Sequence, residues 1–349
     1  MKPEPFRIEP TFSPRIWGAR SLAPLFPEKT HLQEPIGEAW LTDVHCRIAD
    51  GPFAGKSLGE AWSEMPPDWR GSRLATTRDF PLLVKFLFPT DKLSIQVHPD
   101  DAYAAAHESA AGGRGKTEMW YVISAEPGAD VLLGMKPGTT KEDFLASLQS
   151  GTIEALFNEI HVFAGDTIFV PARTGHGIGP GMILCEVQEY SDLTYRVYDY
   201  NRLDAHGKPR ELHIQKALEV INFGHSTGGK ISPLQLPTES GKRNLLAACS
   251  YFATERWDLQ TTVQAQSCAE NFKLLIILDG IGQIQSQGSP REYRRGECWL
   301  IPASLGRFCL QPEQHTGAIV TYVPDLAGLG QDLLRIGISE SRLSATLFG

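Results

Sequence analysis

Two copies of an eight-residue pattern constrain how this chain can fold. The first copy spans residues 165–172 (GDTIFVPA) and the second spans 296–303 (GECWLIPA). Both contain a glycine, an acidic residue, three consecutive apolar residues and then proline, which is typical of a turn and a buried strand that stops where ladder pairing ends. Glycine and proline are spread along the whole chain, as in proteins with many short strands. The repeat therefore predicts a mainly β protein with two jelly-roll β-barrels, which close their sheets and limit exposed edges.

Apolar runs bounded by turn residues predict the individual strands. The predicted strands cover residues 81–88, 93–97, 118–124, 131–134, 167–171 and 183–189. A small helical insert is predicted near 139–158, because a capping-box-like start at 139–143 leads into apolar residues at helical spacing. A second amphipathic helix is predicted over 211–223, and it ends at Gly224.

The length of 349 residues suggests two domains rather than one. Residues 225–241 are rich in glycine, serine, proline and threonine, and we expect them to form the linker. The predicted organisation is an N-terminal catalytic barrel over 1–224, a C-terminal metal-free barrel over 242–325 and a tail over 326–349. Apolar residues in the tail, at Leu329, Leu333, Leu334 and Ile336, predict a short helix there.

Composition excludes several classes of partner. The net charge is −8, which argues against general affinity for nucleic acid or for an anionic membrane, although a few local cations can still bind an anionic substrate. The six cysteines are scattered without a CxxC pair, as in a reducing cytoplasm. The N-terminus lacks the apolar run of a signal peptide, and the longest apolar run, 274–278, is too short to cross a bilayer. We expect a soluble cytoplasmic protein.

Four side chains on distant segments form a candidate metal site. Gln96 and His98 stand at positions i and i+2, so on a strand their side chains share one face. Glu118 and His176 complete a set that suits a divalent metal with an open position for substrate. In the second copy of the repeat, Arg307 takes the place of His176, and residues 272–285 contain no histidine or glutamate. The second barrel is therefore predicted to be structural.

Several segments, in the same order, resemble one enzyme family. SIQVHPDD (94–101), GKTEMWY (115–121), PARTGHGI (171–178) and TYRVYDYNR (194–202) are similar to segments of type I phosphomannose isomerases in their short bacterial form. The resemblance runs from about residue 12 to residue 323. It implies the cupin fold and a zinc-dependent enzyme of carbohydrate metabolism that interconverts mannose 6-phosphate and fructose 6-phosphate through a cis-enediol.

The resemblance also implies roles for particular residues. The family's ligands for one zinc ion per chain fall on Gln96, His98, Glu118 and His176. The family's active-site arginine falls on Arg196, and Ser94 and Lys116 match positions that line the substrate pocket.

The chemistry of aldose–ketose isomerisation gives these residue types a reason. A proton leaves the carbon beside a carbonyl and another returns to its neighbour, and a metal and a fixed cation such as Arg196 stabilise the negative charge that develops. On a strand, the side chains of Lys116 and Glu118 share one face and would point into the same pocket. The residue that moves the protons stays open among Lys116, Glu118, Asp199 and a metal-bound water. Arg202 is a further candidate for binding the phosphate.

Three alternatives remain open at this point. The chain could isomerise another phosphosugar, act as a metal-dependent oxygenase, or bind a phosphosugar without catalysis. The cations Lys116 and Arg196 favour an anionic small-molecule substrate, and this argues against the oxygenase alternative. We expect a monomer or a homodimer, with no nucleic-acid or membrane partner.

Overall fold

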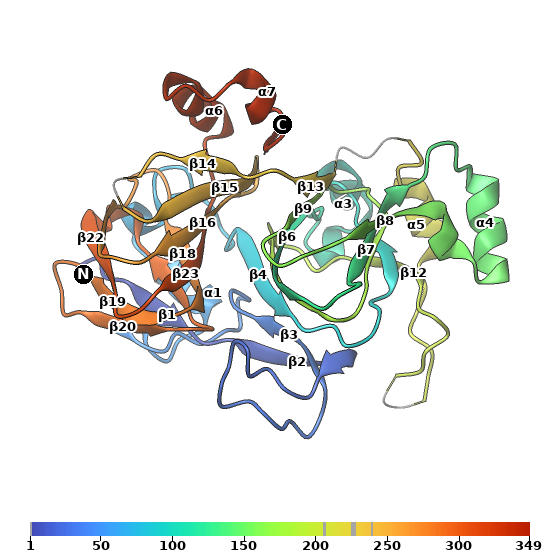
Figure 1. The fold of residues 1–349 in the computed structure, drawn as a ribbon, viewed down its shortest axis with the longest axis horizontal. Helices are drawn as coiled ribbons and strands as arrows, with labels where there is room; N and C mark the ends of the chain where they lie inside the picture. The colour runs from blue at the N-terminus through green and yellow to red at the C-terminus, as the bar shows by residue number, and fades with distance from the viewer. Residues whose placement is uncertain (1, 205–206, 225–227, 239) are drawn as a thin grey trace.

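The chain folds into two β-rich lobes that lie side by side (Figure 1). The structure, a computed structural model, describes residues 2–204, 207–224, 228–238 and 240–349. Each lobe contains a larger and a smaller sheet, and we call the two lobes the N-sandwich and the C-sandwich. The protein is mainly β, as the sequence predicted.

The N-sandwich consists of a seven-stranded and a five-stranded sheet. The larger sheet has the order β13 (Gly229–Ile231), β9 (Thr167–Val170), β6 (Glu118–Ala125), β11 (Met182–Glu189), β4 (Leu82–Leu87), β3 (Ile36–Trp40) and β2 (Thr11–Ala19). The smaller sheet has the order β12 (Tyr195–Tyr198), β5 (Ile95–Val97), β10 (His176–Ile178), β7 (Asp130–Met135) and β8 (Phe157–His161).

The C-sandwich consists of an eight-stranded and a four-stranded sheet. The larger sheet has the order β1 (Phe6–Ile8), β21 (Cys298–Ile301), β18 (Lys273–Asp279), β23 (Thr316–Tyr322), β16 (Ala253–Leu259), β15 (Lys242–Cys249) and β14 (Leu234–Leu236), and β24 (Leu347–Phe348) also pairs with β15. The smaller sheet has the order β17 (Val263–Gln266), β22 (Arg307–Pro312), β19 (Ile281–Gln285) and β20 (Arg291–Arg294).

Strand alternation divides the apolar side chains between inner and outer cores. On β6, Trp120 and Val122 join the core between the two sheets of the N-sandwich, whereas Met119 faces the other way. Met119 belongs to the largest apolar cluster, which also contains Ile276 of β18 and Leu300 of β21 in the C-sandwich. The two large sheets therefore pack against each other and share one core, and their central strands, such as β4 and β18, are buried on both faces.

The helices lie at the periphery of the two sandwiches. They are α1 (Leu58–Glu64), α2 (Pro67–Arg70), α3 (Asp101–His107), α4 (Lys141–Ser150), α5 (Ile214–Val220), α6 (Leu326–Arg335) and α7 (Glu340–Leu343). The capping box predicted before α4 is present: the Thr140 side chain accepts from the Asp143 amide, and the Asp143 side chain accepts from the Thr140 amide. In Figure 1, α4 lies at the far edge of the N-sandwich, and α6 and α7 lie beside the C-sandwich near the C-terminus.

Most predicted elements are confirmed within a few residues, two predictions differ from the structure, and one helix was not predicted. The insert predicted near 139–158 ends earlier, because β8 begins at Phe157 and pairs with β7. The segment predicted as a linker, 225–241, contains β13 and β14, although its residues 225–227 and 239 lie outside the described residues. No helix was predicted where α3 lies.

The N-terminus crosses between the two lobes. β1 pairs with β21 in the large sheet of the C-sandwich, and β2 then pairs with β3 in the N-sandwich. The first strand of the predicted domain 1–224 therefore belongs to a sheet of the predicted domain 242–325. The boundaries of both domains stay a prediction.

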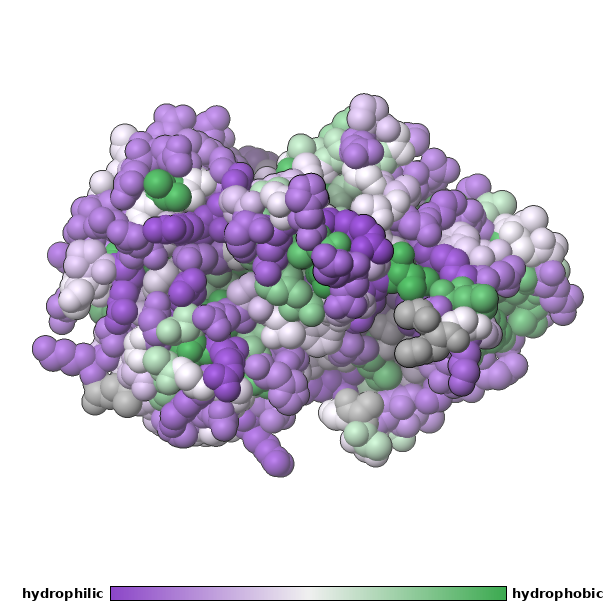
Figure 2. Space-filling view, turned by 90° about the horizontal axis from the view of Figure 1, so that it is seen from below, coloured by the Kyte–Doolittle hydropathy of each residue, from purple (hydrophilic) through white to green (hydrophobic). Residues whose placement is uncertain are grey.

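The face of the molecule in Figure 2 is largely hydrophilic, and hydrophobic residues appear on it in separate patches. Within the described ranges, no helix has the length and apolar character needed to cross a membrane.

Candidate metal centre and its pocket

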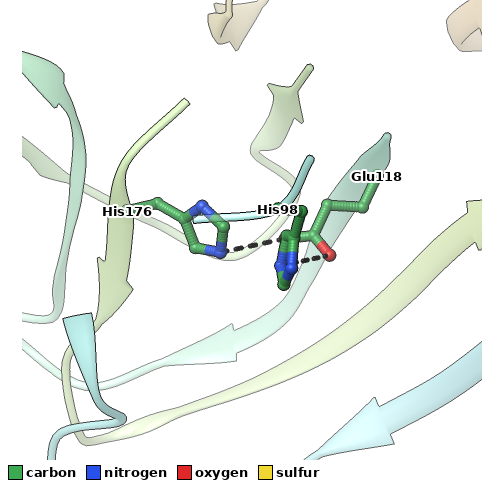
Figure 3. A group of neighbouring side chains, drawn as sticks. All are labelled: His98, Glu118 and His176. Atoms are coloured by element: carbon green, nitrogen blue, oxygen red, sulfur yellow. Dashed lines mark ion pairs between the residues drawn. The ribbon is translucent and has the colours of Figure 1, made fainter. Parts of the chain in front are cut away.

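Three buried side chains of the N-sandwich point toward one another (Figure 3). His176 Nε2 lies 3.4 Å from Glu118 Oε1, and His98 Nε2 lies 3.7 Å from Glu118 Oε2. The ligand atoms of the three residues all lie within 4.8 Å of one another. His176 and Glu118 are 0% exposed and His98 is 2% exposed, so the cluster is shielded from solvent.

The strand register explains why these residues meet. Glu118 begins β6 on the face that Trp120 also uses, so its carboxylate points between the two sheets. On the opposite sheet, Gln96 of β5 pairs directly with His176 of β10. Ile95 and Val97, the neighbours of Gln96, join a separate apolar cluster on the outer side of that sheet. Gln96 therefore points inward, as alternation requires.

Both histidines present an unprotonated Nε2 to the cluster. His98 Nδ1 lies 2.8 Å from the Leu193 carbonyl oxygen, and His176 Nδ1 lies 2.9 Å from the Thr174 carbonyl oxygen. Each Nδ1–H therefore donates to the backbone, which leaves Nε2 unprotonated, with a lone pair of the kind that binds a metal. Burial lowers the pKa of His176 to about 4 and lowers the pKa of His98 well below its ordinary value, so both rings are neutral at pH 7.

The carboxylate of Glu118 is short of hydrogen-bond donors. Within the described part of the chain, neither of its oxygens accepts a hydrogen bond of good geometry, although Lys116 Nζ lies 2.6 Å from Oε2. A buried carboxylate without adequate partners is costly. Two neutral imidazoles and a carboxylate with free lone pairs are a donor set that a divalent cation satisfies, so these residues fit a metal ion.

Gln96 and Ser94 extend this cluster along β5. Gln96 Nε2 lies 3.2 Å from His176 Nε2, and Ser94 Oγ lies 3.5 Å from Gln96 Oε1. Both residues line the cavity that opens beside the cluster. The structure thus places Gln96 next to the three donors and Ser94 one step further away.

Lys116 and Glu186 form a buried charged pair beside Glu118. Lys116 Nζ lies 3.1 Å from Glu186 Oε1 and 3.4 Å from His98 Nε2. Burial alone would lower the pKa of Lys116, but the carboxylates of Glu118 and Glu186 raise it above its ordinary value, so the amine is charged. Burial raises the pKa of Glu186 to about 7, against the opposing effect of Lys116. The Glu186 carboxyl can therefore gain or lose a proton near neutral pH while Lys116 stays charged.

A cavity of about 260 Å³ opens between the two sheets at this end of the N-sandwich. Its lining is mostly charged: Arg15, Glu38, Lys85, Lys116, Glu118, Glu186, Asp192, Arg196 and Arg210, together with Ser94, Gln96, Trp17 and His213 among others. Three of the cations are paired with carboxylates outside the metal cluster. Lys85 pairs with Asp192 at 2.8 Å, Arg15 pairs with Glu38 at 2.7 Å, and Arg210 pairs with Asp199.

Arg196 differs from the other cations of the cavity. It lies on β12 opposite Gln96, and its Nη1 donates to the Glu211 carbonyl oxygen at 3.0 Å. Its Nε is buried without an acceptor, and no carboxylate of the described residues lies within ion-pair distance of it. Burial first, and then the charge of Arg210, lower the pKa of Arg196. A guanidinium with spare donors and no counterion is suited to an anionic group in the cavity.

Arg202 and Asp199 lie outside the lining of this cavity. Arg202 donates to Asp199 Oδ1 at 2.8 Å and pairs with Asp91 at 3.1 Å, so carboxylates already occupy its guanidinium. Burial alone would raise the pKa of Asp199, but hydrogen bonds from Arg210 and Arg202 hold that pKa below its ordinary value. The structure therefore brings Arg210, rather than Arg202, to the cavity.

Sequence reasoning missed Lys85, Glu186 and Arg210. Lys85 and Glu186 pair directly across β4 and β11 on the inward face. A signal was present for both of them, because each is a charged residue inside a strand that is otherwise apolar and buried. No local pattern marks Arg210, because its place at the cavity depends on the ion pair with Asp199.

A larger cavity, of about 880 Å³, lies between the N-terminal segment and the C-sandwich. Its lining includes Arg7, Lys29, Arg295 and Glu297, and the described metal donors His98, Glu118 and His176 lie elsewhere. The smaller cavity is therefore the candidate active site, because it adjoins the metal donors although its volume is smaller.

Comparison with known proteins agrees with this geometry. The family model "Phosphomannose isomerase type I, catalytic domain" matches residues 5–121, and "Mannose-6-phosphate isomerase, cupin domain" matches residues 242–323. The probable mannose-6-phosphate isomerase GmuF of Bacillus subtilis is 35% identical over 315 residues, which cover 88% of this chain and 96% of that protein.

Solved structures show the same similarity. The mannose 6-phosphate isomerase crystal structure from Bacillus subtilis has a TM-score of 0.82 and 30% identity, and the match covers 91% of this chain and 99% of that one. A zinc-bound mannose 6-phosphate isomerase shares the fold with a TM-score of 0.70 and 16% identity, over 91% of this chain and 99% of that one. On the family models and the identity over most of both chains, this chain belongs to the type I phosphomannose isomerase family, whose fold is of the cupin type.

Proposed function

We propose that this chain interconverts mannose 6-phosphate and fructose 6-phosphate, with one zinc ion per chain. Family membership supports the reaction. One structural observation carries the assignment to this cavity. The buried donors His98, Glu118 and His176 adjoin a cavity that also contains Arg196, a guanidinium without a carboxylate partner among the described residues. A metal centre and a free guanidinium in one pocket suit a phosphosugar whose carbons carry negative charge during reaction.

The donor set favours zinc among the common divalent metals. Catalytic zinc sites have three protein ligands of the histidine and carboxylate type and one open position. His98, Glu118 and His176 would hold the ion, and Gln96, whose amide lies beside His176, is a candidate for a further ligand through its oxygen. When bound, the ion would polarise the sugar oxygens and stabilise their negative charge.

Glu186 is the proposed carrier of the proton, with Lys116 as its charged partner. Isomerisation takes a proton from one carbon and returns one to the next, through a cis-enediol, so the carrier must both accept and donate. Glu186 has a pKa of about 7, so it can take up and release a proton near neutral pH, while Lys116, which donates to it at 3.1 Å, stays charged. Lys116 then also stabilises the enediolate oxygens, together with Arg196.

Arg210 is proposed to bind the phosphate, with Ser94 as a neutral neighbour of the sugar. Arg210 lines the cavity, whereas Arg202 does not, which favours Arg210 over the residue suggested by the sequence. Asp199 holds both arginines and would orient Arg210 rather than move protons.

We also propose that the two sandwiches are two cupin domains, over about 1–224 and 242–325, with a linker over 225–241 and a tail over 326–349. Three short strands cross these boundaries: β1 and β14 pair in the C-sandwich, and β13 pairs in the N-sandwich. Register supports a C-sandwich that binds no metal. Glu118 pairs with Val170, and Lys273 pairs with Ile301, which holds the same place in the repeat as Val170. Lys273 thus replaces Glu118, and Arg307 begins β22 as His176 begins β10. Cations at both places repel a metal ion.

A coupled assay tests the function. Purified protein with zinc should convert mannose 6-phosphate to fructose 6-phosphate, and removal of the metal with a chelator should abolish turnover until zinc is returned. Turnover no greater than that of a His98→Ala variant would contradict isomerase activity. Tight sugar-phosphate binding without turnover would instead support the sensor alternative. Location in the cytoplasm and a monomeric or homodimeric state remain predictions, which fractionation and light scattering address.

The two arginines on Asp199 should differ in their effect on substrate binding. Arg210→Ala should raise KM for mannose 6-phosphate about tenfold to a hundredfold, the range for a lost charge-assisted hydrogen bond. Arg202→Ala is the matched control and should change KM less than about threefold, because Arg202 does not line the cavity. Steady-state kinetics on both variants make the comparison, and a larger KM effect for Arg202→Ala would reverse the assignment.

A further inference from the structure

One carboxylate joins the C-sandwich to the segment that carries Lys116. Tyr251 lies in the turn between β15 and β16, and its hydroxyl donates to Asp101 Oδ2 at 2.7 Å. The other oxygen of Asp101 accepts from the Gly115 amide at 2.8 Å. Asp101 therefore links a tyrosine of one sandwich to the backbone next to Lys116 in the other.

A second carboxyl group holds the other side of Lys116. Glu189 ends β11 and is 5% exposed, and its Oε1 accepts from the Thr117 amide at 2.7 Å. Besides burial, Asp101 lies near enough for its charge to raise the pKa of Glu189. The amides of Gly115 and Thr117, on the two sides of Lys116, thus each donate to one of two neighbouring carboxyl groups.

The backbone in this segment has little freedom to move. The Lys116 amide donates to the Pro99 carbonyl oxygen at 3.0 Å. A Cβ on Gly115 would approach the Asp100 carbonyl carbon to 2.6 Å, so only glycine allows this close approach. Because the backbone is fixed on both sides, the ammonium of Lys116 is directed at Glu118 and Glu186.

We propose that Tyr251, Asp101 and Glu189 form a positioning relay, through which the C-sandwich sets the direction of Lys116. None of these three residues lines the cavity, so the relay acts through Lys116 and not on the substrate. The proposal rests on the proposed function for its effect on turnover, but the connection itself is a matter of geometry. It gives the C-sandwich a part in the reaction that its metal-free character does not suggest.

Removal of one hydroxyl tests the relay. Tyr251→Phe should lower kcat about threefold to tenfold, the range for one lost hydrogen bond, while KM stays within about twofold and the zinc content is unchanged. Hydrogen exchange of the amides at 115–117 should become faster in the same variant. Tyr293→Phe is the matched control, because its hydroxyl bonds to Thr316 within the C-sandwich, and it should leave kcat and the exchange at 115–117 unchanged.

The outcomes separate the relay from a structural role and from the proposed function. Equal kcat and equal exchange in Tyr251→Phe and the parent protein would overturn the relay. So would a loss of activity that is matched by an equal loss of zinc or of folded protein. An inactive parent protein would count against the isomerase function alone, because exchange at 115–117 still reports on the relay.

The carboxyl pair also predicts how stability depends on pH. Burial, and then the charge of Asp101, raise the pKa of Glu189 from 4.5 to about 8, against the opposing effects of the Thr117 amide and Arg114. Tyr251 and Cys249 are further ionisable groups that lie near it among the described residues. Because the pKa is higher in the folded state, the unfolded chain loses the Glu189 proton at a lower pH than the folded protein does. The contribution of Glu189 to the free energy of unfolding is therefore complete below about pH 4.5 and falls as the pH rises to about 8.

Glu189→Gln should remove this pH dependence, because the amide cannot ionise and keeps an acceptor for the Thr117 N–H. We expect the melting temperature of the variant to exceed that of the parent by about 5 °C or more at pH 9, and by less at pH 5. Calorimetry at both pH values measures the difference. The same difference at pH 5 and pH 9 would show that Glu189 is ionised in the folded protein throughout.

Discussion

His176→Ala should lose zinc and lower kcat/KM about a thousandfold or more. The ring of His176 is fully buried, its Nδ1 is fixed by the Thr174 carbonyl, and its Nε2 faces both Glu118 and Gln96. Its removal leaves two strong donors, which are too few for a tightly held zinc ion. A metal in such a site contributes several kcal/mol of charge stabilisation, and each 1.4 kcal/mol corresponds to about tenfold in rate.

The prediction has a matched control and a second variant. His161→Ala removes an exposed histidine on β8 and should change neither zinc content nor kcat/KM. His176→Gln fills more of the space left by the ring. It therefore tests whether a loss of activity in His176→Ala comes only from the cavity that alanine leaves. Metal analysis of dialysed protein and the coupled assay give both readouts. One equivalent of zinc retained by His176→Ala would show that this residue is not a ligand.

Lys116→Met should lower kcat about a hundredfold to a thousandfold and make the protein more dependent on zinc for stability. Lys116 is buried between the carboxylates of Glu118 and Glu186, and methionine keeps the length of the side chain without its charge. Removal of one partner from a buried ion pair leaves the other charge uncompensated, which costs about 3–5 kcal/mol. The loss of a fixed cation, and of the charged partner of Glu186, supplies the effect on kcat.

Zinc should partly restore the stability of this variant, because the metal neutralises Glu118 when the lysine is absent. We therefore expect the difference in melting temperature between the zinc-loaded and chelated forms to be larger for Lys116→Met than for the parent. Lys230→Met is the control, since Lys230 pairs with Asp166 at the surface. A kcat within about twofold of the parent, or an equal response to zinc in both proteins, would contradict this role of Lys116.

Patterns that are local in the chain were enough to predict the donors and six of the strands, most of them near the donors. Alternation places Gln96 and Glu118 on the inward faces of their strands. The direction in which these side chains point could therefore be predicted from spacing alone. The same holds for the capped helix α4.

Features that depend on tertiary pairing were missed or misjudged. β13 and β14 lie in a segment of linker-like composition, and each is held by a neighbouring strand, β9 or β15, rather than by its own propensity. α3 was missed because its alanine-rich turn has no apolar stripe, although Asp100 caps it by accepting from the Tyr103 amide. Arg210 reaches the cavity only because it pairs with Asp199.

The core shared by the two large sheets has a consequence for how substrate enters. Many enzymes with two lobes close around a substrate by hinge motion, which requires an interface that can open. Here Phe86 and Val187 of one sheet and Ile276 and Leu300 of the other belong to one continuous apolar cluster. Opening the lobes would expose that cluster to water, at a cost that grows with the apolar area exposed. We therefore expect the sugar phosphate to enter through the segments around the cavity mouth, without separation of the two lobes.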